Sequence, residues 1–276
     1  AEDMASLQKL EELRKKEERF LRKPQADIYQ ILCAVQNLRA GLQHYGTPQF
    51  ARQARMAFMA RAFLRSLTEN GPADGEGKTW FSQEDTDAFM QSISTVSTEF
   101  EKDFRAFSMD EISRAEFNEK YGHLRVGTYD IRTERYDQMN FRPGPSKSKG
   151  KAEAREDALN PGRLAEALKE AGLQVSVEQL LHFIRYAIEQ REYFKFEFTK
   201  SLSLILELLV RAGNEMEIAR NDLSWLEIED FRLPQYMAME ELRDQLEVKI
   251  RRRHKRYQQY RELSLPEVIL NRESLD

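Results

Sequence analysis

The chain has 276 residues, of which 33% are Lys, Arg, Asp or Glu, against only 12 Gly and 8 Pro, so its composition favours helices over strands and turns. A hydrophobic fraction of 41%, with 16 Phe and 10 Tyr, excludes general disorder, and the net charge of −4 argues against a general nucleic-acid binder. No run approaches the roughly 18 uncharged apolar residues of a transmembrane helix, and the N-terminus is acidic and polar rather than a secretory signal. We therefore expect a soluble, cytoplasmic protein.

Eight helices are predicted from apolar periodicity, capping residues and Gly or Pro breaks. Ser82 with Asp85, and Ser108 with Glu111, have the spacing of a capping box. The fold class is therefore all-α, a multi-helix bundle with one long central helix. In chain order we expect helices at residues 4–22, 27–45, 47–68, 83–106, 109–120, 161–171, 177–212 and 234–262.

The polar stretch of residues 142–160, which begins RPGPSKSKGKAEARED, is predicted to be a linker. It separates an N-terminal helical half, residues 1–141, from a C-terminal half, residues 161–276. We expect the two halves to form one composite domain. Residues 70–79 are predicted to be a loop, and residues 265–270 an apolar tail.

Few residues have the spacing of a metal or covalent site. The single cysteine, Cys33, excludes a disulfide framework and a Cys-based zinc site within this chain, and His44, His182 and His254 show no metal-ligand spacing. The chain also lacks a glycine-rich phosphate loop and a nucleophile elbow. We therefore expect no metal site and no self-sufficient active site.

Two cations interrupt the apolar stripe of the long helix. Successive helical residues turn by about 100°, so Arg191 and Lys195 lie one turn apart within the stripe that runs from Val177 to Leu209. Cations on a buried face need anions, because an unpaired buried charge is strongly destabilising. Two interpretations stay open: internal salt bridges to carboxylates of another helix, or a cleft in which the cations bind an anionic ligand.

The helix of residues 47–68 gives a similar indication, because its apolar residues point in nearly every direction and predict a buried helix. It nevertheless carries Arg52, Arg55, Arg61 and Arg65 and no acidic residue. We expect Arg65 to lie deep in the apolar arc and Arg52 to reach water. Their charge is matched either by an external phosphate or carboxylate or by internal acids. The internal candidates are Glu99, Asp103, Asp130 and Glu192.

A loop that contains Gly122 and Gly127 adds His123, Arg125, Tyr129 and Asp130. A rigid turn that hydrogen-bonds its own backbone explains this composition. A chemical role for the titratable imidazole of His123 is the alternative, and the two are compatible.

Three segments resemble one family. Residues 121–137, YGHLRVGTYDIRTERYD, resemble the YGHLRPGTYDI segment of bacterial phosphoenolpyruvate-synthase-like proteins, a branch of the phosphoenolpyruvate-utilising dikinases. Residues 45–67 resemble the family's YGT-x-x-FA-x-x-AR stretch ending in LRSL, and residues 191–207 its RE-x-x-KF-x-FTK-x-LS stretch. The motifs keep the family order, and the similarity spans most of residues 25–270.

The departures from the family pattern are few. Val126 stands where the family has Pro, Ser201 replaces Asn, and residues 70–79 contain a Gly-rich insertion. None of these differences changes a charged position of the motifs.

The resemblance implies a helical module from the middle of a larger phosphotransferase. Family enzymes place an ATP-grasp domain first and a swivelling domain with a phosphorylated His last, and in related antibiotic phosphotransferases the helical region between them holds the acceptor. None of the four His residues lies in a Thr-x-His-Ala context, so catalysis by this chain alone is not expected. ATP and Mg are implied for the full-length enzyme, and no cofactor for this chain. The implied partners are the two missing domains, in cis or in trans, and an anionic or hydroxyl acceptor, without nucleic acid or membrane.

Our leading hypothesis is a polar patch that receives an anionic acceptor or the phosphohistidine arm, with His123 or Asp130 as a base for an acceptor hydroxyl. One alternative is a helical spacer or interaction module whose cations are all paired internally, and another is a free-standing regulator in a split enzyme. The patch is predicted to comprise Arg55, Arg65, His123, Arg125, Tyr129, Asp130, Arg191 and Lys195.

Overall fold

The computed structural model describes residues 2–24, 26–72, 78–139, 153–232 and 237–264, and within them the predicted all-α fold is confirmed. This part of the chain contains no strand, only an isolated antiparallel bridge between Arg125 and Arg135. In chain order the helices are α1 (Glu2–Arg22), α2 (Ile28–Gly41), the π-helical turn η1 (Leu42–Gly46), α3 (Thr47–Glu69), α4 (Gln83–Ser92), α5 (Val96–Ser108), α6 (Arg114–Tyr121), α7 (Pro161–Glu170), α8 (Val177–Glu215), α9 (Arg220–Leu223), the 3-10 turn η2 (Ile228–Phe231) and α10 (Met239–Arg261).

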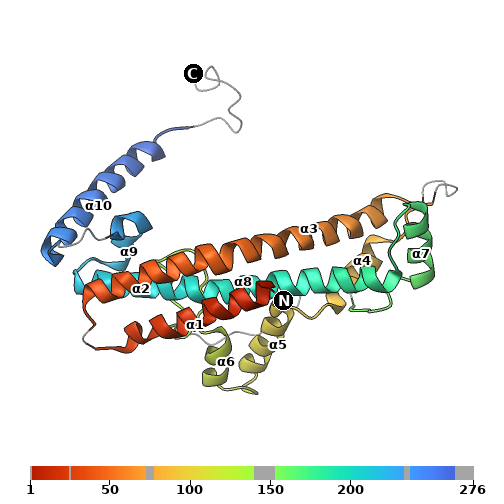
Figure 1. The fold of residues 1–276 in the computed structure, drawn as a ribbon, viewed down its shortest axis with the longest axis horizontal. Helices are drawn as coiled ribbons and strands as arrows, with labels where there is room; N and C mark the ends of the chain where they lie inside the picture. The colour runs from red at the N-terminus through yellow and green to blue at the C-terminus, as the bar shows by residue number, and fades with distance from the viewer. Residues whose placement is uncertain (1, 25, 73–77, 140–152, 233–236, 265–276) are drawn as a thin grey trace.

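The predicted long helix is confirmed as α8, whose 39 residues give a rod of about 58 Å. It begins at a capping box, in which the Ser176 hydroxyl accepts a hydrogen bond from the Gln179 N–H. The helices α1, α2 and α3 pack along it, and α5 contacts its middle (Figure 1). The first half of the chain thus depends on a helix from the second half for its core.

Two main apolar clusters fill the space around α8, and a third, of Phe107, Phe117 and Tyr121, packs against Phe196 of α8. The larger joins α1, α2 and the second half of α8 to α9 and α10, and includes Leu38, Leu208 and Leu246. The smaller joins the end of α3 to α4, α7 and the first half of α8, and includes Leu64 and Ile184. No helix in the described residues is long and apolar enough to cross a membrane.

The expected break at Gly46 is wrong, because α2, η1 and α3 form one continuous helical run. A Cβ atom at Gly46 would lie 3.0 Å from the Phe198 ring and 3.3 Å from the Leu10 side chain. Gly46 therefore does not end a helix. Because it lacks a side chain, the helical run can approach α1 and α8 closely at this point.

The expected helix over residues 83–106 is divided into α4 and α5. Thr95 and Thr98 form a capping box that begins α5, and Ser113 with Glu116 begins α6 in place of the predicted Ser108 and Glu111. This division and the short α9 account for ten α-helices in the described residues instead of eight.

Part of the predicted linker packs as core. The Leu159 side chain is only 1% exposed and joins the smaller apolar cluster, while the Arg155 N–H donates to the carbonyl of Ala88. Residues 142–152 of that linker and the predicted apolar tail lie outside the described residues. The predicted end of α7 at Gly172 is confirmed, since this glycine has a φ of +67°.

Candidate functional site

The loop after α6 is a rigid turn that bonds to its own backbone, as one interpretation predicts. The Tyr136 N–H donates to the Leu124 carbonyl at 2.9 Å, and the Asp137 N–H donates to the Gly122 carbonyl at 3.2 Å. A Cβ atom at Gly122 would lie 2.4 Å from the Asn118 carbonyl oxygen, so only glycine fits this close backbone approach.

Arg125 points from this loop into the interior and meets a carboxylate of α8. Its Nη2 lies 2.5 Å from Oε1 of Glu207, and its Nε donates to the Ser203 hydroxyl at 3.3 Å. Gln138 donates to the other oxygen of Glu207 at 2.6 Å, and Arg220 approaches the first at 3.3 Å. The Arg125 side chain is 1% exposed. The prediction that Arg125 binds substrate is therefore corrected: its guanidinium is held by an internal salt bridge.

Burial and hydrogen bonds act in opposite directions on this pair. Burial raises the pKa of Glu207, but hydrogen bonds from Gln138 and Arg125 and the nearby guanidinium charges outweigh it, so the pKa is lowered. Burial lowers the pKa of Arg125, which the Glu207 contact opposes. Glu207 is not among the predicted site residues, although it is the only acidic residue in the apolar stretch of residues 198–214.

His123 lies against α8 with its ring edge toward Phe196 at a centroid distance of 4.8 Å. Its Nε2 atom is buried and has no hydrogen-bond partner among the described residues. Burial, reinforced by the nearby charges of Lys200, Arg135 and Arg14, lowers the pKa of His123 to about 3. The ring is therefore neutral at physiological pH and too weak a proton acceptor for the predicted role as base.

The arginines of α3 do not lie in a buried cleft, which corrects the prediction of a helix buried on all sides. Arg55 and Arg65 are exposed, and Arg65 approaches only Glu69 at 3.7 Å. Phe58 and Met59 are 61% and 66% exposed. The face toward α8 is made of small and aliphatic residues, so one stripe of α3 suffices for packing. Its buried apolar members are Ala57, Ala60, Leu64 and Leu67.

The four internal acids proposed as partners for those arginines are occupied elsewhere. Glu99 and Asp103 approach Lys120 at 3.1 and 2.9 Å, while Asp130 pairs with Arg132 at 2.7 Å. The fourth acid, Glu192 of α8, accepts a hydrogen bond from the backbone N–H of Ser97 in α5 at 3.1 Å.

Two hollows lie on either side of the loop. The first, the cationic hollow, has a volume of about 450 Å³ and lies between α5, α8 and the loop. Arg191 and Lys195 line it together with Thr128 and Thr199. Its apolar lining includes three aromatic side chains, Phe100, Tyr121 and Phe196.

The cations of this hollow form no direct ion pair within the described part of the chain. Lys195 is exposed and Arg191 half-buried, and neither forms an ion pair with another described residue. Two carboxylates also line the hollow, but Glu192 is held by the Ser97 N–H and Glu101 has a contact of its own. Of the eight predicted residues, Arg191 and Lys195 therefore fit the anion-binding interpretation best.

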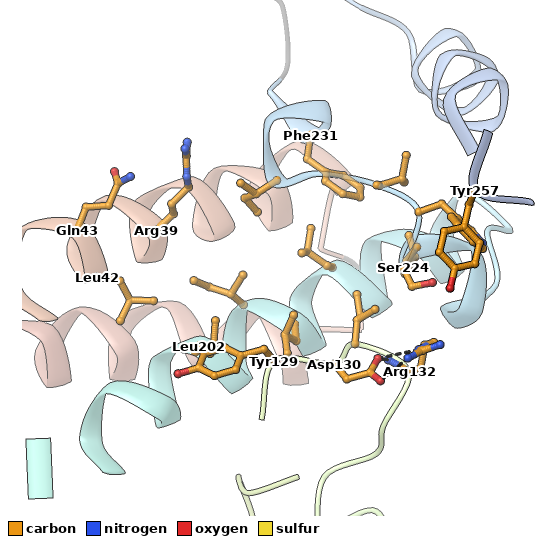
Figure 2. A pocket seen from close by; sticks show the side chains of 18 residues that line it. Arg39, Leu42, Gln43, Tyr129, Asp130, Arg132, Leu202, Ser224, Phe231 and Tyr257 are labelled. Atoms are coloured by element: carbon orange, nitrogen blue, oxygen red, sulfur yellow. Dashed lines mark hydrogen bonds and ion pairs between the residues drawn. The ribbon is translucent and has the colours of Figure 1, made fainter. Parts of the chain in front are cut away.

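The second, the apolar hollow, has a volume of about 690 Å³ and holds Tyr129 and Asp130 at its edge (Figure 2). Its walls include three leucines and one isoleucine of α8 and aromatic side chains from other elements, such as Phe231. Asp130 faces Arg132, whose hydrogen bonds lower its pKa. The predicted single patch is thus divided, because Tyr129 and Asp130 line a different hollow from Arg191 and Lys195.

α3 is also separated from the cationic hollow, since Figure 1 shows α3 and α5 on opposite sides of α8. In the described residues there is no group of three or more His, Cys, Asp and Glu side chains that could hold a metal ion. No protein-family model, curated protein or solved structure matches the chain.

Proposed function

We propose that this chain is the helical acceptor-docking module of a phosphoenolpyruvate-synthase-like phosphotransferase and that it binds an anionic group in the cationic hollow. The group is a phosphate or carboxylate, carried by the acceptor or by the phosphohistidine arm. The chain positions this group and is not catalytic alone. ATP and Mg are used by the ATP-grasp domain, present in cis or in trans, in the cytoplasm of a bacterium.

The observation that carries this proposal is a pair of cations that line one hollow and form no ion pair with any residue that the structure describes. Arg191 and Lys195 are spaced one turn apart on α8, at the centre of a rigid helix rather than on a mobile loop. A guanidinium and an ammonium at this spacing suit the oxygens of one phosphate. In phosphoryl transfer, most of the protein's contribution is positioning and charge stabilisation, for which such a pair is suited.

The positions of two motifs also support the proposal. The loop motif of residues 121–137 and the α8 motif of residues 191–207 contact each other through Arg125 and Ser203 and through His123 and Phe196. Both motifs contribute to the cationic hollow. Two of the three segments that carry the family resemblance thus meet at the place where the anion would bind, and the third, residues 45–67, does not line the hollow.

The test is thermal unfolding with inorganic phosphate, pyrophosphate or phosphoenolpyruvate at millimolar concentration, with KCl at matched ionic strength as reference. A ligand that binds only the folded chain raises its Tm. We expect a rise for the unmodified chain and none for the variant Arg191→Ala/Lys195→Ala. The matched control, Arg55→Ala/Arg65→Ala, also removes two positive charges. We expect its Tm to rise with the anion as much as that of the unmodified chain.

One structural feature favours the second candidate, a helical spacer. Arg125 is fully engaged with Glu207, as the spacer interpretation requires of every buried cation. If no anion raises the Tm above the KCl reference, or if the Arg191→Ala/Lys195→Ala variant responds as fully as the control, the docking function is wrong and the spacer stands.

A further inference from the structure

The exposed face of α3 has an uncompensated positive charge. Arg55 and Arg61 form no ion pair within the described part of the chain, and no acidic residue occurs between Thr47 and Thr68. Phe58 and Met59 lie among these arginines and are mostly exposed. Large exposed apolar side chains next to unpaired charges are typical of interaction surfaces.

The first half of α10 carries the opposite charge. Glu241, Asp244 and Val248 share one face by their spacing, and all three are exposed. Neither Glu241 nor Asp244 forms an ion pair with another described residue. This acidic face is therefore as unpartnered as the basic face of α3.

The opposite side of α10 is fixed to its own chain. Leu242 and Leu246 are buried in the larger apolar cluster, and Lys249 donates a hydrogen bond to Asp230 at 3.0 Å. Arg253 also binds Asp230. The helix projects from the end of the bundle (Figure 1). The helical spacing places the exposed Glu241 and Asp244 on the side opposite the buried leucines.

We propose that this chain forms a dimer in which the α3 face of each copy docks on the acidic face of α10 of the other. Arg55 and Arg61 would face Glu241 and Asp244, with Phe58 and Met59 covering Val248, one turn beyond Asp244. In a two-fold dimer this contact occurs twice, which closes the assembly. The proposal is independent of anion binding in the cationic hollow.

A second copy fits better than an anionic membrane or a nucleic acid. The complementary acids and apolar side chains are on the chain itself, while the net charge of −4 opposes approach to a polyanion. Packed helices usually cross at an angle and touch over a few turns. The α3 arginines can therefore meet the acidic start of α10 while the basic residues 251–256 diverge from them.

The experiment is sedimentation velocity over a series of protein concentrations at low and high salt. We expect a monomer–dimer equilibrium that weakens with salt. The charge reversals Arg55→Glu/Arg61→Glu and Glu241→Arg/Asp244→Arg should each raise the dissociation constant more than about tenfold, because like charges then face each other. An equimolar mixture of the two variants restores both contacts and should form a heterodimer.

The control Lys102→Glu/Arg105→Glu makes the same charge change on the exposed face of α5 and should leave the dissociation constant unchanged. Circular dichroism confirms that each variant is helical, and heterodimer formation shows independently that both fold. An unmodified chain that stays monomeric throughout overturns the proposal, as does a mixture that fails to pair. A monomer that floats with phosphatidylserine–phosphatidylcholine vesicles through Arg55 and Arg61 assigns the face to a membrane instead.

Discussion

Arg125 and the arginines of α3 lie in similar stretches of sequence, but Arg125 is buried and the α3 arginines are exposed to solvent. Both have aromatic and aliphatic neighbours in the sequence, such as Leu124 beside Arg125 and Phe63 near Arg65. Arg125 is buried because Glu207 reaches it from α8, whereas Arg55 and Arg65 are exposed because only one stripe of α3 packs. An arginine is thus buried where a distant element supplies a carboxylate, and the surrounding hydrophobicity does not decide it.

The largest effect is expected from removing the Glu207 carboxylate, on which the burial of Arg125 depends. Glu207→Ala leaves the Arg125 guanidinium buried without its counter-charge, so we expect a loss of about 3–5 kcal/mol in the free energy of unfolding. Urea denaturation followed by circular dichroism measures it. The matched control Glu69→Ala removes the exposed partner of Arg65 and should cost less than about 0.5 kcal/mol.

A double replacement distinguishes the effect of the ion pair from the effect of filling the buried space. Arg125→Met/Glu207→Leu fills the same space with apolar atoms and should recover most of the stability lost in Glu207→Ala. If Glu207→Ala costs no more than Glu69→Ala, the guanidinium finds water or another partner, and the contrast between the two regions is wrong.

His123 predicts an acid sensitivity that the α3 face lacks. Its pKa is about 3 in the folded chain, against about 6.5 in an unfolded one. Below pH 6.5 the unfolded chain therefore binds a proton that the folded chain does not, and stability falls with pH until about pH 3. Between about pH 7 and pH 5 the expected loss is about 2 kcal/mol.

The measurement is urea denaturation at several pH values across this range. His123→Gln should remove the pH dependence in this window, whatever its effect on stability at neutral pH. His182→Gln, at an exposed position of α8, should keep it. A slope that persists in His123→Gln would show that the imidazole is hydrated and that the region around it is more open than Arg125 and Glu207 indicate.

The helices could be predicted because their signals are local. A capping box at Ser176, a glycine after α7 and an apolar stripe determine where a helix begins, ends and packs within a few residues of chain. The error at residues 83–106 concerns local signals too. The capping boxes at Thr95 and Ser113 begin α5 and α6, whereas the prediction placed the second helix start at Ser108.

The site depended on contacts that local patterns do not contain. Arg125 and Glu207 are 82 positions apart, and only packing of the loop on α8 brings them together. Counting apolar residues also overrated the burial of α3, because Ala57 and Ala60 form its packed face while Phe58 and Met59 face solvent. Arg191 and Lys195 could be singled out because their signal, two cations within an apolar stripe, is again local to one helix.

The smallest effect on the free energy of unfolding is expected for the exposed arginine Arg65. Arg65→Ala removes a guanidinium that is 71% exposed and 3.7 Å from Glu69, so the free energy of unfolding should change by less than about 0.5 kcal/mol. Urea denaturation at low protein concentration, where any self-association is absent, gives the intrinsic value. A loss above about 1 kcal/mol would mean that Arg65 has a partner comparable to Glu207. The distinction between an arginine held by a buried carboxylate and arginines that stay exposed would then fail, because both would depend on charges contributed from elsewhere in the fold.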